Sequence, residues 1–85
     1  MKEFSYTITD SVGIHARPAG VLVKLIKPLA SKCTITKGDK TEELGKLMKV
    51  MGMGIKCGDT VVIKVEGPDE AVAAETIEKF FKDNL

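Results

Sequence analysis

The sequence predicts a two-layer α+β domain in which helices cover one face of a mainly antiparallel sheet. The chain has 85 residues, enough for one modest core, so we expect residues 1–85 to form a single domain. The spacing of apolar residues switches between strand and helix periods and gives the order β-α-β-β-α-β-α. The outward positions of the predicted strands are mostly polar, so one sheet face is expected to remain open to water: Ser5, Thr7, Thr34, Thr36 and Lys64.

A strand and a helix are predicted in the first third of the chain. The segment from Lys2 to Ile8 alternates, with Phe4, Tyr6 and Ile8 on one side, which indicates a half-buried strand. A helix is expected from Ala16, where the apolar period changes. Pro18 suits its first turn and Pro28 ends it. The apolar face of this helix carries Ala19, Leu22, Val23 and Ile26.

A hairpin and a short helix are predicted next. A strand from about Lys32 to Lys37 is followed by the turn signal Gly38-Asp39, so Lys40 to Glu43 is expected to be a short returning strand. The inward residues of the first of these strands are Cys33 and Ile35. The segment Lys46 to Met51 lies between two glycines and predicts a short helix.

The last predicted elements are the most apolar strand and a final helix. Thr60 to Glu66 alternates, with Val61, Ile63 and Val65 on one face. After Gly67-Pro68, we expect the Asp69 side chain to cap the final helix. The inward residues of that helix are expected to be Val72, Ala73, Ile77, Phe80 and Phe81.

Composition excludes several classes of function. The net charge of +1 and the few aromatic residues argue against nucleic-acid binding. No segment resembles a signal peptide or is apolar enough to insert into a membrane, so we expect a cytoplasmic protein. A single histidine, with Cys33 and Cys57 outside any ligand spacing, predicts no metal and no cofactor. We expect both thiols to be reduced, although a disulfide between them stays open at this stage.

The stretch from Gly13 to Ala19 carries the chemistry. It places His15 where a loop becomes a helix, beside backbone amides that have no intrahelical acceptor. An anion on this side chain is favoured there, and the guanidinium of Arg17 is expected to approach the same anion. Neutral imidazole is a nucleophile near pH 7, and a phosphoryl group on a ring nitrogen remains transferable. The alternative is that His15 is only a surface residue or a helix cap.

Gly13-Ile14-His15-Ala16-Arg17-Pro18-Ala19 resembles the active-site signature of HPr, the histidine-containing phosphocarrier family of the bacterial phosphotransferase system. The resemblance extends over essentially the whole chain without gaps, and it includes Leu44, Met48, Val50, Met51, Gly54, Ile55 and Gly58. It implies an open-faced β-sandwich with four antiparallel strands and three helices. It also implies that enzyme I, charged by phosphoenolpyruvate, phosphorylates His15 on Nδ1, and that the group passes to the IIA component of a sugar transporter. The phosphate is expected to lie against Arg17 and the amides of Ala16 and Arg17.

Two helices are expected to dock the partners. The short helix is apolar on more than one side, so part of it should be exposed, and methionine suits a surface that accepts several partner shapes. A loosely packed core edge there and a solvated face on the first helix are the alternatives. The family uses both helices as its docking surface. We therefore expect a monomer whose docking residues are Arg17, Gly20, Lys24, Leu47, Met48 and Met51.

The chain departs from the family at a regulatory position. Many family members carry a phosphorylatable serine at the start of the short helix, whereas Lys46 stands here, so serine-linked catabolite regulation is expected to be absent. Lys46 would place a permanent positive charge in the docking surface and favour acidic partners. Val12 and Lys49 also differ from the usual residues, with no functional effect assigned from sequence.

Three functions remain open at the level of sequence. The first is a carrier of phosphoryl groups for sugar uptake, which is a relay substrate and not an independent enzyme. The second is a carrier in a parallel regulatory phosphorelay. The third is an interaction module that has the fold but conducts little phosphate; the presence of both His15 and Arg17 argues against it. The sugars served are not encoded in any recognisable feature.

Overall fold

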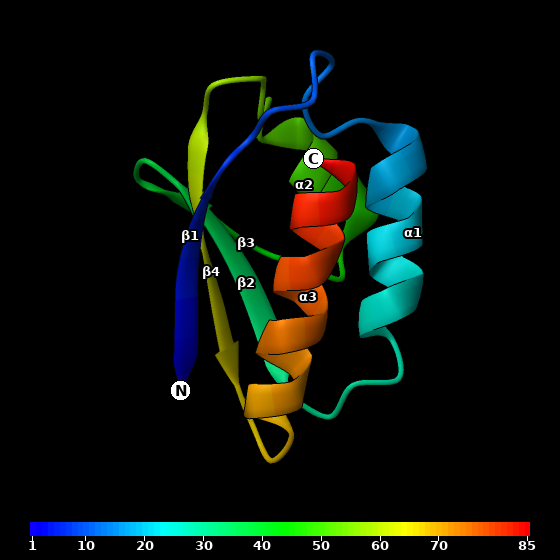
Figure 1. Ribbon diagram of the computed structural model, residues 1–85, viewed down its shortest axis with the longest axis vertical. Helices are drawn as coiled ribbons and strands as arrows, with labels where there is room; N and C mark the ends of the chain where they lie inside the picture. The colour runs from blue at the N-terminus through cyan, green and yellow to red at the C-terminus, as the bar shows by residue number, and fades with distance from the viewer.

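The computed structural model describes residues 1–85 as a four-stranded sheet with three helices on one face. Figure 1 shows α1 and α3 side by side and antiparallel in front of the sheet, with α2 at the end where α1 begins. The elements are β1 (Lys2–Thr7), α1 (Ala16–Ile26), β2 (Lys32–Lys37), β3 (Lys40–Glu43), α2 (Leu47–Gly52), β4 (Thr60–Glu66) and α3 (Glu70–Asn84). The predicted fold class and element order are confirmed.

All neighbouring strands of the sheet are antiparallel, in the order β1-β4-β2-β3. Phe4 pairs with Ile63, and Ile63 pairs with Ile35, so one row of apolar side chains crosses three strands. The opposite face carries threonine pairs whose hydroxyls lie 2.8 Å apart, Thr7 with Thr60 and Thr36 with Thr41. Because these hydroxyls pair with each other and are exposed to solvent, that face needs no cover.

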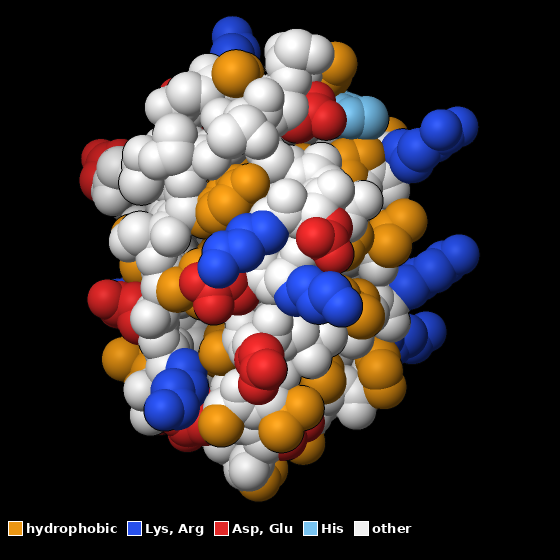
Figure 2. Space-filling model, in the orientation of Figure 1, with side chains coloured by type: hydrophobic (Ala, Val, Ile, Leu, Met, Phe, Trp, Pro, Cys, Tyr) orange, Lys and Arg blue, Asp and Glu red, His pale blue; other side chains and the backbone are white.

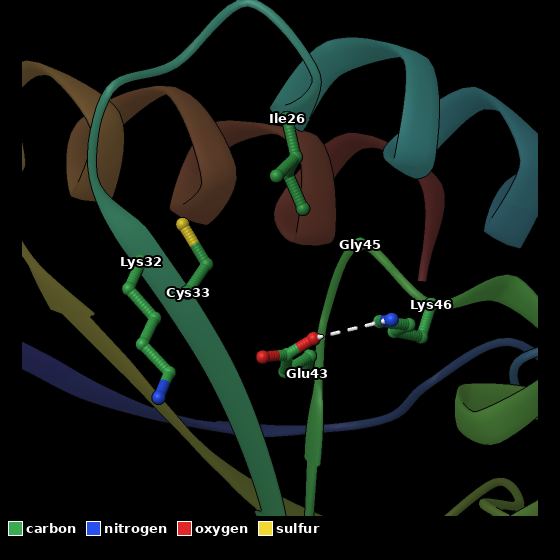
Figure 3. A pocket seen from close by; sticks show the side chains of 6 residues that line it. All are labelled: Ile26, Lys32, Cys33, Glu43, Gly45 and Lys46. Carbon is green, nitrogen blue, oxygen red and sulfur yellow. Dashed lines mark ion pairs between the residues drawn. The ribbon is translucent and has the colours of Figure 1, made fainter.

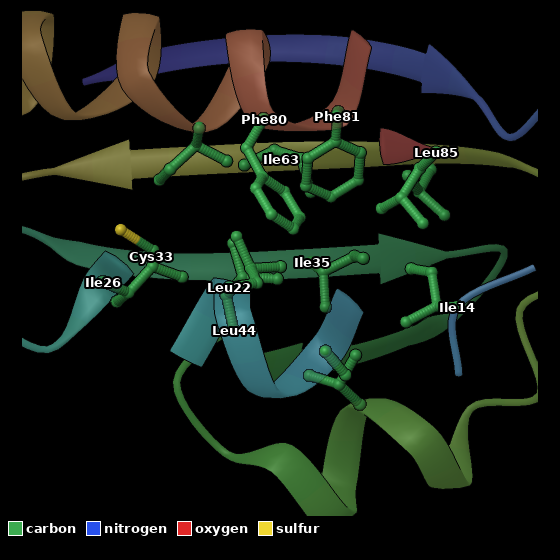
Figure 4. Packing of buried hydrophobic residues seen from close by; sticks show 14 of the residues in the cluster. Ile14, Leu22, Ile26, Cys33, Ile35, Leu44, Ile63, Phe80, Phe81 and Leu85 are labelled. Atoms are coloured by element: carbon green, nitrogen blue, oxygen red, sulfur yellow. The ribbon is translucent and has the colours of Figure 1, made fainter. Parts of the chain in front are cut away.

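The core lies between the apolar face of the sheet and the helices, as Figure 4 shows. Phe81 is fully buried at its centre. Its ring contacts those of Phe4 and Tyr6 edge to face, with centroids 6.1 and 5.6 Å apart. These contacts fix α3 against β1, and α1 packs against both α2 and α3.

Two expectations for α3 are wrong. Val72 is 65% exposed. The buried stripe of the helix consists of Ala73, Ile77, Phe80 and Phe81, and Val72, which precedes Ala73, is rotated about 100° from it around the helix axis. Asp69 holds the N-cap position, but its carboxylate makes no cap hydrogen bond. It accepts hydrogen bonds from the Ser31 hydroxyl and from the Ala30 N–H, at 3.0 Å for the latter, and so holds the loop between α1 and β2.

The remaining element boundaries agree with the sequence to within a residue. β1 ends at Thr7, and Ile8, which was expected to be its last residue, is buried just beyond the strand. Pro28 follows the end of α1 as expected, with Lys27 as the C-cap. None of the three helices combines the length and apolar character needed to cross a membrane.

Candidate functional site

The loop before α1 is fixed by a close contact with the segment between α2 and β4. Gly13 has φ +80°, and a Cβ on it would lie 2.4 Å from the carbonyl oxygen of Ile55. The next residue, Ile14, donates its N–H to that same oxygen at 3.1 Å and is buried. Only glycine fits this approach, and the contact sets where the chain enters α1.

His15 is the N-cap residue of α1. Its backbone is extended, and its carbonyl accepts the first helical hydrogen bond, from the Ala19 N–H at 3.0 Å. Its side chain is half-buried and makes no cap hydrogen bond, so the imidazole remains available. The N–H groups of Ala16 and Arg17 donate no backbone hydrogen bond. The imidazole therefore lies beside the positive end of a helix with two free donors, as expected.

His15 and Arg17 line one cavity of about 300 Å³. In Figure 2 the pale-blue side chain, which is this histidine, lies at the surface beside red acidic atoms and near a projecting blue basic side chain. Arg17 itself is exposed, so its guanidinium can reach an anion on the imidazole. The other lining residues are Asp10, Pro18, Val21, Phe80 and Asn84.

Sequence reasoning missed the contributions of Asp10 and α3 to this cavity. Asn84 is 69 residues from His15, and its Nδ2 donates to the Phe80 carbonyl at 3.0 Å. Only the packing of α3 beside α1 brings it here, so no local signal could have found it. Asp10 was detectable, because an acidic residue five positions before the histidine was a candidate for the same loop.

The residues expected to dock partners lie on the two helices that contact each other, α1 and α2. Arg17 and Lys24 are exposed, while Gly20 is half-buried. On α2, Met48 is 77% and Met51 37% exposed, and Leu47 is partly buried against the core. Val21, 52% exposed, adds to the apolar part of this surface. An apolar patch of this kind, flanked by basic side chains, suits partner docking.

Lys46 is the N-cap residue of α2 and makes no side-chain cap hydrogen bond. Its Nζ lies 3.8 Å from Oε2 of Glu43, as the dashed line in Figure 3 marks. Both side chains are more than half exposed, so the pair contributes little to stability and is easily exchanged for a partner's carboxylate. A second cavity, of about 320 Å³, lies here between Lys46, Lys32 and Cys33.

The two cysteines are free and lie in different surroundings. Cys33 is buried, and burial, with a smaller effect from the Asp69 charge, raises the pKa of its thiol. Cys57 is exposed, with its sulfur 3.8 Å from the Thr9 carbonyl. No group of three or more His, Cys, Asp or Glu side chains is arranged to hold a metal ion.

Comparisons with known proteins identify the family of this chain. The family model for the PTS HPr component phosphorylation site matches residues 2–83. The chain is 41% identical to the phosphocarrier protein HPr of Mycoplasma capricolum over 98% of its own length and 93% of the relative's. It is 39% identical to the HPr of Lysinibacillus sphaericus over 91% of this chain and 88% of that one.

Solved structures show the same fold. A histidine-containing phosphocarrier protein of Mycoplasma superposes with a TM-score of 0.93 at 40% identity, covering 96% of this chain and 93% of the other. The family match, the relatives and the shared fold all cover nearly the full chain. The chain belongs to the HPr family of phosphocarrier proteins of the phosphotransferase system.

Proposed function

We propose that Nδ1 of His15 accepts a phosphoryl group from phosphoenolpyruvate-charged enzyme I and passes it to the IIA component of a sugar transporter. The observation that carries this proposal is the position of the imidazole, which is unbonded at the N-cap of α1 in the cavity it shares with Arg17. Among the functions left open by the sequence, both phosphoryl relays require His15 and Arg17 at one site, whereas the interaction module does not.

The transfer needs only positioning and charge stabilisation from this chain. The lone pair of Nδ1 forms a bond to phosphorus as the bond between phosphorus and the donor breaks. The electron pair of the broken bond stays with the donor. In this proposal the free N–H groups of Ala16 and Arg17, together with the Arg17 guanidinium, bind the phosphoryl oxygens. In the second transfer the phosphorus–Nδ1 bond breaks in the same way, and His15 returns to the free state.

The same proposal assigns docking to the exposed surface of α1 and α2. Val21, Met48 and Met51 supply apolar contact, and Arg17 and Lys24 supply positive charge for acidic partner surfaces. The apolar patch lies on α1, whose N-cap is His15, and on α2, which packs against α1. In this proposal a partner seated on the patch covers the site and excludes water during transfer. Gly20 leaves open space above the helix, with no atom within 4 Å of the place a Cβ would occupy.

Labelling from phosphoenolpyruvate tests the relay. The protein is incubated with enzyme I and labelled phosphoenolpyruvate, alongside His15→Ala and Cys57→Ser. We expect acid-labile, alkali-stable label on the wild type, because a phosphorus–nitrogen bond to imidazole has that stability. The label should be lost in His15→Ala. It should be retained in Cys57→Ser, which removes the exposed alternative nucleophile. An unlabelled wild type, with an enzyme I shown to phosphorylate another HPr, contradicts the proposal.

We also propose that this carrier lacks serine-linked regulation, since lysine cannot accept the phosphate at position 46. The exposed ammonium of Lys46 instead adds positive charge beside the docking residues of α2. A Lys46→Ser variant should therefore bind enzyme I no better than the wild type, as titration calorimetry can measure. Clearly tighter binding by the variant would refute this role for Lys46.

A further inference from the structure

A fixed carboxylate shares the cavity of the phosphorylated histidine. Asp10 is the only acidic residue among those that line the cavity with His15. Arg17 lines the same cavity but forms no ion pair with Asp10, so no salt bridge neutralises the negative charge of the Asp10 carboxylate.

Three hydrogen bonds hold Asp10 in place. Its Oδ1 accepts from the Val12 N–H at 2.8 Å, and its backbone carbonyl accepts from the Gly13 N–H at 3.0 Å. Its own N–H donates to the Leu85 carbonyl oxygen at 2.7 Å. Because its side chain and its backbone are both hydrogen-bonded and the residue is half-buried, Asp10 has a defined position at the cavity.

We propose that Asp10 sets the transfer potential of phosphorylated His15, by destabilising the phosphorylated state relative to the free state. A phosphoryl group brings a charge of about −2 into a cavity that already contains one fixed negative charge. The repulsion opposes acceptance from the donor and favours release to the acceptor. Arg17 and the amides of α1 act in the opposite direction, so the balance between them fixes how readily the group moves on.

The inference rests on the proposed function, and an equilibrium measurement separates the two. The protein is equilibrated with catalytic enzyme I at varied ratios of phosphoenolpyruvate to pyruvate, and the phosphorylated fraction is read by phosphorus NMR. Asp10→Asn removes the charge and keeps an oxygen to accept from Val12 N–H. We expect Asp10→Asn to be half-phosphorylated at a ratio of phosphoenolpyruvate to pyruvate about fivefold lower than the wild type needs, because the repulsion is removed.

Matched variants distinguish charge from structure. Asp10→Ser is a second neutral variant and should shift the ratio in the same direction, while Asp10→Glu should restore most of the wild-type value. Asp39→Asn removes a charge from the exposed turn between β2 and β3 and should leave the ratio unchanged. The shift in Asp10→Asn should also shrink in about 1 M salt, because screening weakens a charge effect and leaves a packing effect untouched.

The outcomes are distinct. A wild type that takes no phosphate contradicts the proposed function and this inference with it. If the wild type is phosphorylated but Asp10→Asn reaches half-phosphorylation at the same ratio of phosphoenolpyruvate to pyruvate, the inference is overturned and the proposed function stands. An equal shift in Asp39→Asn, or a shift that salt does not reduce, overturns it as well.

Discussion

Gly13 shows how one residue positions the site. Its positive φ is accessible to other residues at a cost, but the missing side chain cannot be replaced, because the Ile55 carbonyl occupies the space that a Cβ would need. The contact lies two residues before His15. A shift of the loop here moves the N-cap residue, its imidazole and the free amides together.

A Gly13→Ala variant should lose about 3 kcal/mol of unfolding free energy, because it adds a steric clash to the strain of a positive φ. Urea unfolding measures the loss. Gly38→Ala is the control: its φ of +62° carries the same backbone strain, but nothing lies within 4 Å of the added Cβ. We expect about 1 kcal/mol there. Equal losses in the two variants would show that the Ile55 contact contributes nothing.

At the scale of elements, Asp69 joins the start of α3 to the loop between α1 and β2. The Ser31 hydroxyl and, to a smaller extent, the Ala30 N–H hold the pKa of its carboxyl below the ordinary value. Gly67, where a Cβ would lie 2.6 Å from Cα of Ser31, permits the close approach of the two segments. The C-terminal end of α1 and the N-terminal end of α3 are thereby fixed relative to each other.

The Asp69 contact predicts a pH dependence of stability. Because the folded-state pKa is depressed, the stabilisation is present above the unfolded-state pKa of about 3.9 and is lost as pH falls through the lower folded-state value. The difference in unfolding free energy between wild type and Asp69→Asn should therefore be largest above about pH 5 and shrink below about pH 4. Urea unfolding at pH 7 and pH 3 measures it.

Asp39→Asn is the control for this measurement, since it removes one negative charge from an exposed turn. The other carboxyls with depressed pKa values, Asp59 and Glu70, are common to all three proteins and cancel in the comparison. A wild-type-minus-Asp69→Asn difference that stays constant between the two pH values would contradict the role of the Asp69 charge.

At the scale of the whole molecule, the two layers are held together by one apolar core. Phe81 on α3 contacts rings from β1, while Leu22 and Ile26 of α1 and Val50 of α2 bury against the same sheet. The cavity beside His15 has one wall from α1 and another from Phe80 and Asn84 of α3. The shape of the site therefore depends on the packing of helices that are distant in sequence.

Phe81→Ala should lose about 3–5 kcal/mol of unfolding free energy, a large share of the stability of a small domain. Val72→Ala, on the exposed side of the same helix, should change it by less than about 0.5 kcal/mol. Both values come from urea unfolding, and the pair tests the orientation of α3. A loss at Val72 comparable to that at Phe81 would mean that the exposed and buried sides are wrongly assigned.

Local patterns were enough to predict most of the fold. Strand periods of two and helix periods near 3.6 report which side chains face an apolar layer, so β1 to β4 and all three helices were placed from sequence. The errors fall on α3. Val72 is apolar yet lies one residue from the buried stripe. Asp69 has the chemistry of a cap, but its carboxylate accepts from Ala30 and Ser31 in the loop between α1 and β2. The local sequence pattern cannot decide whether Val72 faces inward or whether Asp69 caps the helix, since both depend on which residues pack nearby.

The sequence by itself determined the site's chemistry: a histidine at a helix start and an arginine two residues on. Those features are local, because helix geometry fixes neighbours within a turn. Only the tertiary structure decided that the Ile55 carbonyl makes glycine necessary at position 13, that Phe80 and Asn84 complete the cavity and that Asp69 ties two segments together. Such contacts join residues far apart in the chain, and they are selected by the burial of the shared core, which no local pattern records.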